Sequence, residues 1–303
     1  MKKSHQHSGR LTQIRYQLVF EASQSNPEFE VTRVLKQLKV SKSGYYAWLK
    51  RKKSPQQLHK EMVMEKIQQI HKESHGIYGA PKITECLKKK GHTISQRTVS
   101  LYMKELGIRA CWVRPYTITT LNSDFNSRLT NVLDRNFNPE RPNEVWCTDI
   151  TYIWTIADGF VYLTSIMDLY SRKIIAWTLS KTLEVEEVLK CVEIAKQRRE
   201  IKDPLIIHSD RGIHFTCRKY SELTNGMKRS YSEKGVPYDN ACIESFHSLI
   251  KKERLNRKVI LDYDHVYDLC FEYIETFYNT ARIHSHCDYM SPKQYEDLWN
   301  KVN

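Results

Sequence analysis

The stretch VWCTDITYIWTIADGFVYLTSIMDLYSRKIIAWTLS, residues 145–180, decides the fold. It contains three runs of β-branched and aromatic residues, at 145–156, 159–170 and 173–180. Short turns that include Asp158-Gly159 and Ser171-Arg172 separate these runs, which predicts an antiparallel meander of three strands. The first run also carries a carboxylate, Asp149, which is costly to bury unless it is paired or binds a metal ion.

After the meander, helical and strand-like segments alternate. Helices are expected at 183–199, 217–225 and 240–254, and strands at 205–208 and 228–232. The run Leu205-Ile206-Ile207-His208 is short and apolar, which is typical of a buried parallel strand. Together the segments predict an α/β layer fold with a mixed five-stranded sheet and flanking helices. Helices at 265–282 and 292–299 complete the chain.

Two further acids stand at the ends of predicted elements. Asp210 directly follows the fourth strand, at the carboxyl edge where α/β folds bind their ligands. Glu244 lies one turn into the helix that begins near Asn240. Any one of the three acids alone fits a solvated or capping carboxylate. Asp149, Asp210 and Glu244 together match the carboxylates of a two-metal phosphoryl-transfer site.

The charge of the chain is unevenly distributed. The whole sequence has 48 Lys and Arg against 35 Asp and Glu, a formal net charge of +13. Residues 1–144 carry +14 of this, whereas residues 145–303 carry −1. A basic surface can serve solubility alone, but an excess this concentrated favours nucleic acid as the partner. The 40% hydrophobic content excludes a wholly disordered chain.

The amino-terminal segment, residues 1–56, predicts three short helices. Apolar spacing places them at 11–22, at 31–38 and from Tyr45 onward. Ser41-Lys42-Ser43-Gly44 is interpreted as the turn before the third helix, and Lys42 as a DNA contact. This arrangement resembles a helix-turn-helix, with an ordinary three-helix packing unit as the alternative.

A second helix-turn-helix is predicted at residues 57–109. Its helices are expected at 61–72, 81–90 and 96–106, and Ser95 is the predicted N-cap of the last one. Gln96 and Arg97 face outward at the start of that helix, where they suit hydrogen bonds to base edges. The side chains expected to contact phosphates are Lys88, Lys89 and Lys90. Residues 110–139 lack an apolar period and predict a linker to a domain at 140–303.

Compartment and cysteine chemistry follow from what the sequence lacks. The longest apolar runs, such as 160–167, are far shorter than the roughly 18–20 residues of a membrane helix. No apolar run of secretory type follows Met1-Lys2-Lys3, so a cytoplasmic protein without a membrane partner is expected. The eight cysteines form no Cys-x-x-Cys pair and predict reduced thiols. A zinc site at His284, His286 and Cys287 would lack its second pair of ligands.

The acids are embedded in motifs that resemble a known family. The motifs are Trp146-x-Thr148-Asp149-Ile150-Thr151, His208-Ser209-Asp210-x-Gly212, and Tyr238-Asp239-Asn240-Ala241-x-x-Glu244-Ser245-Phe246 followed by Lys251. They resemble the catalytic domain of DDE transposases of the IS-three family of insertion sequences. The likeness extends to Ser41–Trp48, to Tyr78–Gly107 and to Tyr278-Asn279-x-x-Arg282-x-His284. The 33 residues between Asp210 and Glu244 are two fewer than that family usually has.

The resemblance implies an RNase-H-like fold and a transposase. Such a transposase would cleave the ends of an insertion sequence and transfer the strands to target DNA. The implied catalytic and metal-binding residues are Asp149, Asp210 and Glu244, holding two Mg²⁺ ions for which Mn²⁺ can substitute.

The implied partners are double-stranded DNA, both the terminal inverted repeats and the target, and further copies of the chain in at least a dimer. Lys251 is expected to hold the DNA backbone, with a solvated lysine beside Lys252 as the alternative. His208 and Asn240 are expected to support the acids, and a packed strand-end histidine is the alternative for His208. The location is the bacterial cytoplasm, with nucleoid association on DNA. Alternatives are a DNA-binding regulator without catalysis and another RNase-H-like nuclease or integrase.

Overall fold

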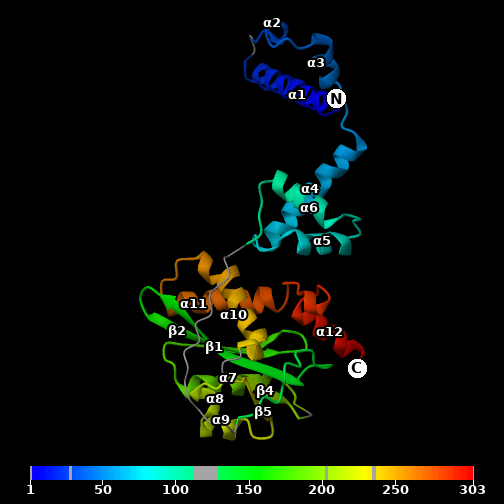
Figure 1. Cartoon of the computed structure of the whole chain (residues 1–303). Helices are drawn as coiled ribbons and strands as arrows, with labels where there is room; N and C mark the ends of the chain where they lie inside the picture. Colours follow the sequence, from blue (N-terminus) through cyan, green and yellow to red (C-terminus); the bar gives the residue numbers. More distant parts are fainter. Residues whose placement is uncertain (1, 27–28, 112–128, 202–203, 234–236, 303) are drawn as a thin grey trace. The chain divides into compact units, whose positions relative to one another are not determined.

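The computed structural model describes residues 2–26, 29–111, 129–201, 204–233 and 237–302 of the 303-residue chain (Figure 1). The chain divides into two compact units, Met1–Glu65 and Lys66–Asn303. The boundary falls inside helix α4, Pro55–Glu73, which begins six residues before the predicted position. A proline is tolerated at the start of a helix because its missing N–H would be unbonded there in any case.

The first unit contains three helices, α1 (Lys2–Ser25), α2 (Val31–Gln37) and α3 (Lys42–Leu49). Its small core is formed by Tyr16, Val19, Leu35 and Tyr45. Helix α3 begins at Lys42 rather than Tyr45. The hydroxyl of Ser41 accepts a hydrogen bond from the Gly44 amide at 3.2 Å, so the residues expected to form the turn make up the first helical turn instead.

The second unit opens with the end of α4 and continues with α5 (Ala80–Lys89) and α6 (Gln96–Glu105). Ser95 is the N-cap of α6, as predicted, because its hydroxyl accepts a hydrogen bond from the Thr98 amide at 3.1 Å. Val99 and Met103 are buried, and the opposite face of α6 is exposed. The sequence-based prediction of these two helices is therefore confirmed to within one or two residues.

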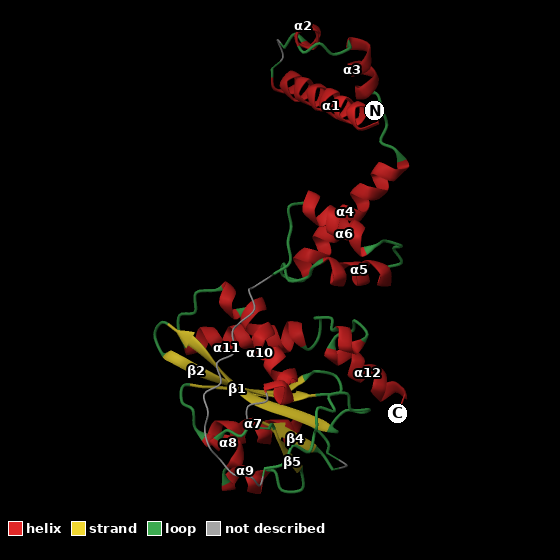
Figure 2. Cartoon of the chain, in the orientation of Figure 1, coloured by secondary structure: helices red, strands yellow, loops and turns green. Residues whose placement is uncertain are grey.

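A five-stranded mixed sheet follows, with flanking helices, as the sequence predicts (Figure 2). Its strands are β1 (Val145–Thr155), β2 (Gly159–Asp168), β3 (Ile174–Ser180), β4 (Ile206–Ser209) and β5 (Lys228–Tyr231). The order in the sheet is β3-β2-β1-β4-β5. The first three strands form the antiparallel meander, and β4 pairs in parallel with both β1 and β5. This arrangement is an RNase-H-like α/β fold.

Helices cover both faces of the sheet (Figure 2). One face carries α7 (Val185–Arg198), α8 (Ile213–Thr216) and α9 (Arg218–Leu223). The other carries α10 (Ala241–Glu253) and α11 (Tyr263–Phe271). The π-helix η3 (Glu272–Tyr278) continues α11, and α12 (Pro292–Val302) ends the chain. Short 3-10 turns are η1 (Pro237–Asn240), η2 (Leu255–Arg257) and η4 (Ser285–Cys287).

One short helix was not predicted, and one predicted helix differs from the structure. The helix expected at 217–225 corresponds to α9, and α8 is an additional short helix before it, separated from α9 by the extended backbone of Cys217 (ψ 161°). The helix expected at 265–282 ends at Tyr278, and its second half has π geometry. Periodicity cannot distinguish these forms, since all of them place apolar residues three or four positions apart.

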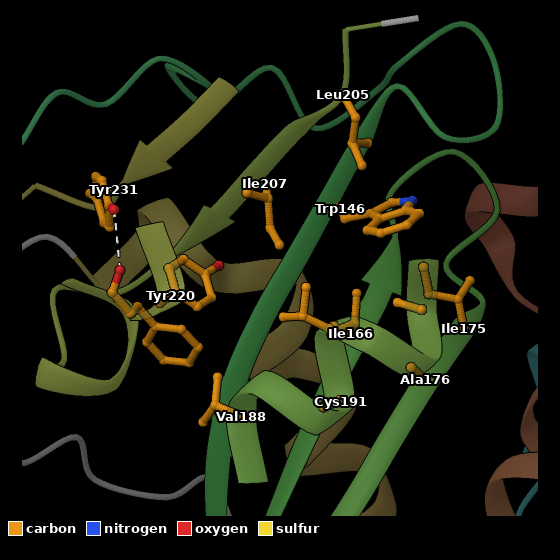
Figure 3. Close-up of a cluster of buried hydrophobic side chains, with 13 residues drawn as sticks. Trp146, Ile166, Ile175, Ala176, Val188, Cys191, Leu205, Ile207, Tyr220 and Tyr231 are labelled. Atoms are coloured by element: carbon orange, nitrogen blue, oxygen red, sulfur yellow. Dashed lines mark hydrogen bonds between the residues drawn. The ribbon is translucent and has the colours of Figure 1, made fainter. Parts of the chain in front are cut away.

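The main core lies between the sheet and α7. Trp146 and Ile166 are completely buried at its centre, and Val188 of α7 packs there (Figure 3). Tyr231 donates a hydrogen bond from its hydroxyl to the Phe215 carbonyl at 3.1 Å, which fixes α8 against β5. These contacts hold β1 and β4 in place against α7 and α8.

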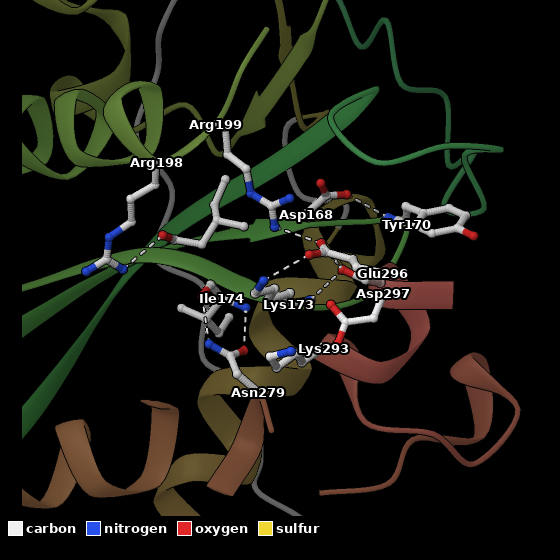
Figure 4. A network of polar contacts seen from close by, with 12 residues as sticks. Asp168, Tyr170, Lys173, Ile174, Arg198, Arg199, Asn279, Lys293, Glu296 and Asp297 are labelled. Carbon is white, nitrogen blue, oxygen red and sulfur yellow. Dashed lines mark hydrogen bonds and ion pairs between the residues drawn. The ribbon is translucent and has the colours of Figure 1, made fainter. Parts of the chain in front are cut away.

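A buried polar network attaches the carboxyl-terminal helices to the sheet (Figure 4). Glu296 of α12 accepts hydrogen bonds from Lys173 at 2.9 Å and from Arg199 at 2.7 Å. The side-chain amide of Asn279 bonds both the N–H and the carbonyl of Ile174, at 3.0 and 2.9 Å. Asn279 belongs to one of the motifs that resemble the transposase family. Its side chain bonds the first residue of β3, which is an edge strand of the sheet.

Helix α5 and the loop before it also contact the carboxyl-terminal region. The Tyr78 hydroxyl accepts a hydrogen bond from the Ile283 amide at 2.9 Å. The Lys89 ammonium donates to the carbonyl oxygens of Tyr289 and Asp288, at 2.7 and 3.3 Å. These bonds make α5, α6 and the catalytic domain parts of one compact unit.

The predicted linker, 110–139, is described only in part, since 112–128 lie outside the described residues. From 129 onward the segment packs against β5. The Ser230 hydroxyl accepts hydrogen bonds from the amides of Val132 and Leu133, both at 2.9 Å. The residues 129–139 therefore belong to the catalytic domain. In the described chain, no helix is both long enough and apolar enough to cross a membrane.

Candidate functional site

The three predicted acids come from three neighbouring elements. Asp149 lies in the middle of β1, and Asp210 follows β4, which pairs in parallel with β1 through Cys147 and His208. Because both acids lie two residues beyond that pair, they stand side by side on neighbouring strands, at the point where β4 ends. Glu244 is in the first turn of α10, which packs across β1 and β2.

Their negative charges act on one another. Desolvation by the surrounding protein atoms and the negative charge of Asp149 raise the pKa of Asp210 to about 6. Desolvation and the negative charges of Asp149 and Asp210 also raise the pKa of Glu244. Asp149 and Asp210 also line a pocket of about 190 Å³. This repulsion between the negative charges is reduced when a cation binds between the acids.

Two of the three carboxylates have a bond to a neighbouring group. An Asp210 oxygen accepts a hydrogen bond from the Gly212 amide at 2.8 Å, and an Asp149 oxygen lies 3.3 Å from Nδ1 of His247. Within the described ranges, no three His, Cys, Asp or Glu side chains converge closely enough to enclose a metal ion. Asp149 and Asp210 are therefore neighbours on adjacent strands, and each has a separate bond that fixes its direction.

His247 is a site residue that the sequence analysis missed. It is buried on α10 between Asp149 and Ser165, and its Nε2 lies 3.3 Å from the Ser165 hydroxyl. Ser165 is the residue of β2 that pairs with Asp149 of β1. The spacing could have indicated this role, because His247 follows Glu244 by three residues and shares its helix face.

His208 and Asn240 lie near the acids in different ways. Burial lowers the pKa of His208 to about 4, so the ring is neutral, and its nitrogens bond the hydroxyls of Ser230 and Ser232 at 2.8 and 3.1 Å. These bonds join β4 to β5, as for a packed strand-end histidine. The Asn240 amide donates to the carbonyl of Thr148, next to Asp149, at 3.4 Å.

Asp239 is a buried acid of the same region that is fully engaged. Its carboxylate accepts hydrogen bonds from Arg135 at 2.8 Å, from Asn131 at 2.9 Å and from the Glu233 amide at 2.8 Å. Although burial alone would raise the pKa of Asp239, these bonds lower it. Asp239 thus fastens the 129–139 segment to the catalytic domain.

Lys251 lies near the catalytic edge, half-buried on α10. Its ammonium stands 4.9 Å from the ring centroid of Tyr152, which also lines the acidic pocket. Burial lowers the pKa of Lys251, and the charge of Asp149 acts in the opposite direction. A cation therefore stands beside the pocket in which the acids lie.

The side chains predicted to contact DNA differ in how far they are already engaged. Gln96 and Arg97 are exposed at the amino end of α6, and Lys42 is exposed at the start of α3. All three lysines at 88–90 are exposed, but Lys88 pairs with Glu85 at 2.9 Å and Lys89 bonds two carbonyl oxygens within the protein.

Three family models match the chain in the order of its domains. An HTH-like domain matches residues 58–116, and two models of an integrase core domain match residues 139–237 and 225–292. The transposase for insertion sequence element IS904 of Lactococcus lactis is 36% identical over 249 residues, which cover 81% of this chain and 98% of that relative. The chain belongs to the IS-three family of insertion-sequence transposases. The transposase InsF for insertion sequence IS3A of Escherichia coli is 30% identical over 274 residues, covering 89% of this chain and 95% of the relative.

Solved structures with a similar chain course include an integrase catalytic core. The HTLV-2 integrase catalytic core domain in complex with magnesium has a TM-score of 0.41 and 18% identity, and covers 52% of this chain and 98% of that one. The transposase is a DDE-type polynucleotidyl transferase that acts on DNA in transposition and integration.

Proposed function

We propose that Asp149, Asp210 and Glu244 are the catalytic triad of the transposase. In this proposal they hold two Mg²⁺ ions, for which Mn²⁺ can substitute, and the site cleaves DNA at the ends of the insertion sequence and joins those ends to target DNA. One observation carries the proposal: three carboxylates from β1, β4 and α10 lie close enough to raise the pKa values of Asp210 and Glu244.

The donor set suits a divalent cation. Carboxylate oxygens are hard ligands that Mg²⁺ prefers, and their mutual repulsion favours a bound cation. Asp210 and Glu244 are open to solvent, so an ion can reach them. A buried oxygen of Asn240 without a hydrogen-bond partner adds an unused acceptor near β1. Bound there, the metal would polarise the phosphodiester and activate water or a 3′-hydroxyl for in-line attack.

Other residues of the chain orient the site. His247 holds one oxygen of Asp149, and the Gly212 amide holds one oxygen of Asp210, so each carboxylate keeps its second oxygen for another partner. Lys251 places a positive charge beside the pocket, where it would neutralise a phosphate of the bound strand.

The proposed substrate is double-stranded DNA, with the terminal inverted repeats recognised through Gln96 and Arg97 of α6. Lys42, Lys88 and Lys90 would add phosphate contacts. Joining two ends to one target favours at least a dimer on DNA. The proposed location is the bacterial cytoplasm, with nucleoid association through bound DNA.

Single substitutions test the triad. Asp149→Ala, Asp210→Ala and Glu244→Ala should each abolish cleavage and leave DNA binding and folding intact, because they remove metal ligands and not the basic surface. Glu233→Ala, in the same region, is the matched control and should cleave normally. Substantial cleavage by the Glu244 variant, with loss in the Glu233 variant, would contradict the assignment of the third acid. A protein that binds DNA equally in EDTA and never cleaves it would instead be a regulator.

A further inference from the structure

Three aromatic side chains are exposed on the hairpin of β1 and β2. Tyr152 and Trp154 of β1 are 56% and 60% exposed, and Phe160 of β2 is 47% exposed. The ring centroid of Phe160 lies 5.4 Å from that of Tyr152 and 4.9 Å from that of Trp154. We call these three residues the aromatic patch. Clustered aromatic surface left open to water is typical of an interaction site.

The strand register fixes this patch on the outer face of the hairpin. Trp154 is directly opposite Phe160 in the antiparallel pair, and Tyr152 is two residues before it on the same face. The alternating residues Ile153 and Thr155 are buried on the opposite face. The rings therefore stand on a regular part of the sheet and not on a loop that could fold away.

The patch is continuous with the pocket of the acids. Tyr152 lines that pocket together with Asp149 and Asp210. Along the strand, Tyr152 is about 10 Å and Trp154 about 17 Å from Asp149, at roughly 3.3 Å per residue. At about 3.4 Å per stacked nucleotide, these distances correspond to about the third and the fifth nucleotide from the phosphodiester bond at the acids.

We propose that the aromatic patch stacks the unpaired bases of the DNA strand that is being cut. The inference rests on the proposed function, because it assumes that the phosphodiester lies at the three acids. Paired bases in a duplex are already stacked on their neighbours, so only an opened strand offers its faces to these rings. Stacking on aromatic side chains tolerates any base, so the patch can act without adding to sequence recognition.

The neighbouring charge favours a nucleic acid over a second protein surface. The ammonium of Lys251 stands 4.9 Å from the centroid of the Tyr152 ring, and the charge of Asp149 acts on it from nearby. An apolar protein partner would remove this ammonium from water without adding an anion, which is costly. A DNA strand that stacks its bases on the patch supplies phosphates for the same ammonium.

The experiment compares two DNA probes with the full-length chain in Ca²⁺, which keeps the DNA uncut. One probe is a duplex, and the other is the same duplex with about five unpaired nucleotides at one end. The wild type should prefer the forked probe. Trp154→Ala should weaken forked binding at least about fivefold, leave duplex binding unchanged and leave the salt slope unchanged, because no phosphate contact is removed. Trp154→Phe should retain most of the preference.

Phe271→Ala is the matched control, since Phe271 is a 48% exposed aromatic on α11 that does not line the acidic pocket. It should bind both probes as the wild type does. The proposal is overturned if the wild type shows no preference for the fork, or if Trp154→Ala keeps it. It is also overturned if Trp154→Ala only dissociates oligomers in sedimentation without DNA. Cleavage of the duplex in Mg²⁺ is scored separately, and its absence in the wild type would count against the triad and not against stacking.

Discussion

At the scale of single residues, the ionisation of Asp210 governs when the site can bind a metal. Its pKa of about 6 lies above the ordinary value of 3.8, so the folded protein holds this proton more tightly than the unfolded chain does. Without metal, stability contributed by this group is present below about pH 4 and is lost as the pH rises through about 6.

Metal affinity should show the opposite trend. Because a carboxylate must lose its proton to bind Mg²⁺, we expect the affinity to rise up to about tenfold per pH unit below pH 6 and to level off above about pH 7. Mg²⁺ titrations followed by calorimetry at several pH values measure this. An affinity that is flat between pH 5 and 7 would show that Asp210 is not a ligand.

His247 offers a second test at this scale. His247→Leu should raise the Mg²⁺ concentration needed for cleavage about tenfold or more, because Asp149 loses the group that orients it. His247→Asn should restore much of the affinity, since its amide can donate from nearly the same position. The direct measurement is Mn²⁺ binding to each folded variant. Equal binding by wild type and the leucine variant would assign His247 to packing alone.

The residue scale also shows what the sequence could reveal. The three proposed catalytic acids were recognisable because each stands within a distinctive motif, Asp149 in an otherwise apolar strand and the other two at the ends of elements. For His247 the sequence offered only its spacing from Glu244, because its contact with Ser165 depends on the pairing of β1 and β2 that brings Ser165 opposite Asp149. His208 was ambiguous for the same reason, since the two serines that bind it come from β5 and the residue after it.

At the scale of elements, a buried ion pair fixes α10 to the region after the π-helix. Arg282 forms two hydrogen bonds to Glu253 of α10, at 2.6 and 2.7 Å, and Tyr273 donates a third at 2.6 Å. Although burial alone would raise the pKa of Glu253, these bonds lower it. Since α10 carries Glu244 and His247, this pair also supports the site.

Breaking this pair should be costly. Arg282→Met should lower the free energy of unfolding by about 3–5 kcal/mol, because it leaves the Glu253 carboxylate buried without its cationic partner. Urea denaturation measures the loss. The double variant with Glu253→Leu should recover most of the stability, and a loss below about 1 kcal/mol in the single variant would contradict the buried pair.

Helix α6 gives a second element-scale prediction. Arg97→Ala should weaken binding to the element's own end by about 1–3 kcal/mol and change binding to random DNA little, because a bidentate base contact carries discrimination. Lys90→Ala should weaken binding to both DNAs alike. Paired titrations on specific and random duplexes distinguish the two, and equal losses for Arg97→Ala would make α6 a structural helix.

The elements themselves were largely predictable, with errors that have physical causes. All five strands and the cap at Ser95 follow from local composition. The extra short helix α8, the π-helix and the early start of α4 do not, because they depend on packing and on backbone geometry that leave apolar spacing unchanged. The 129–139 segment lacks an apolar period, yet it is held by Ser230 and Asp239 from distant parts of the sequence.

At the scale of the whole molecule, the net positive charge and the proposed catalytic acids lie in different halves of the sequence. The basic half, residues 1–144, carries +14, and the half with the three acids carries −1. DNA affinity should therefore fall steeply with salt in the wild type and in every triad variant alike, because counterion release depends on the basic half. This separation is what allows loss of catalysis to be distinguished from loss of binding.

Strand cleavage tests the central claim most directly. A duplex that carries the element's end is incubated with wild type, Asp149→Ala, Asp210→Ala or Glu244→Ala in Mg²⁺ and in Ca²⁺, and DNA binding is measured in parallel. The account predicts cleavage by the wild type in Mg²⁺ only, and a loss of more than about a hundredfold in each variant at unchanged DNA affinity. Cleavage at the wild-type rate by any of the three variants would contradict it.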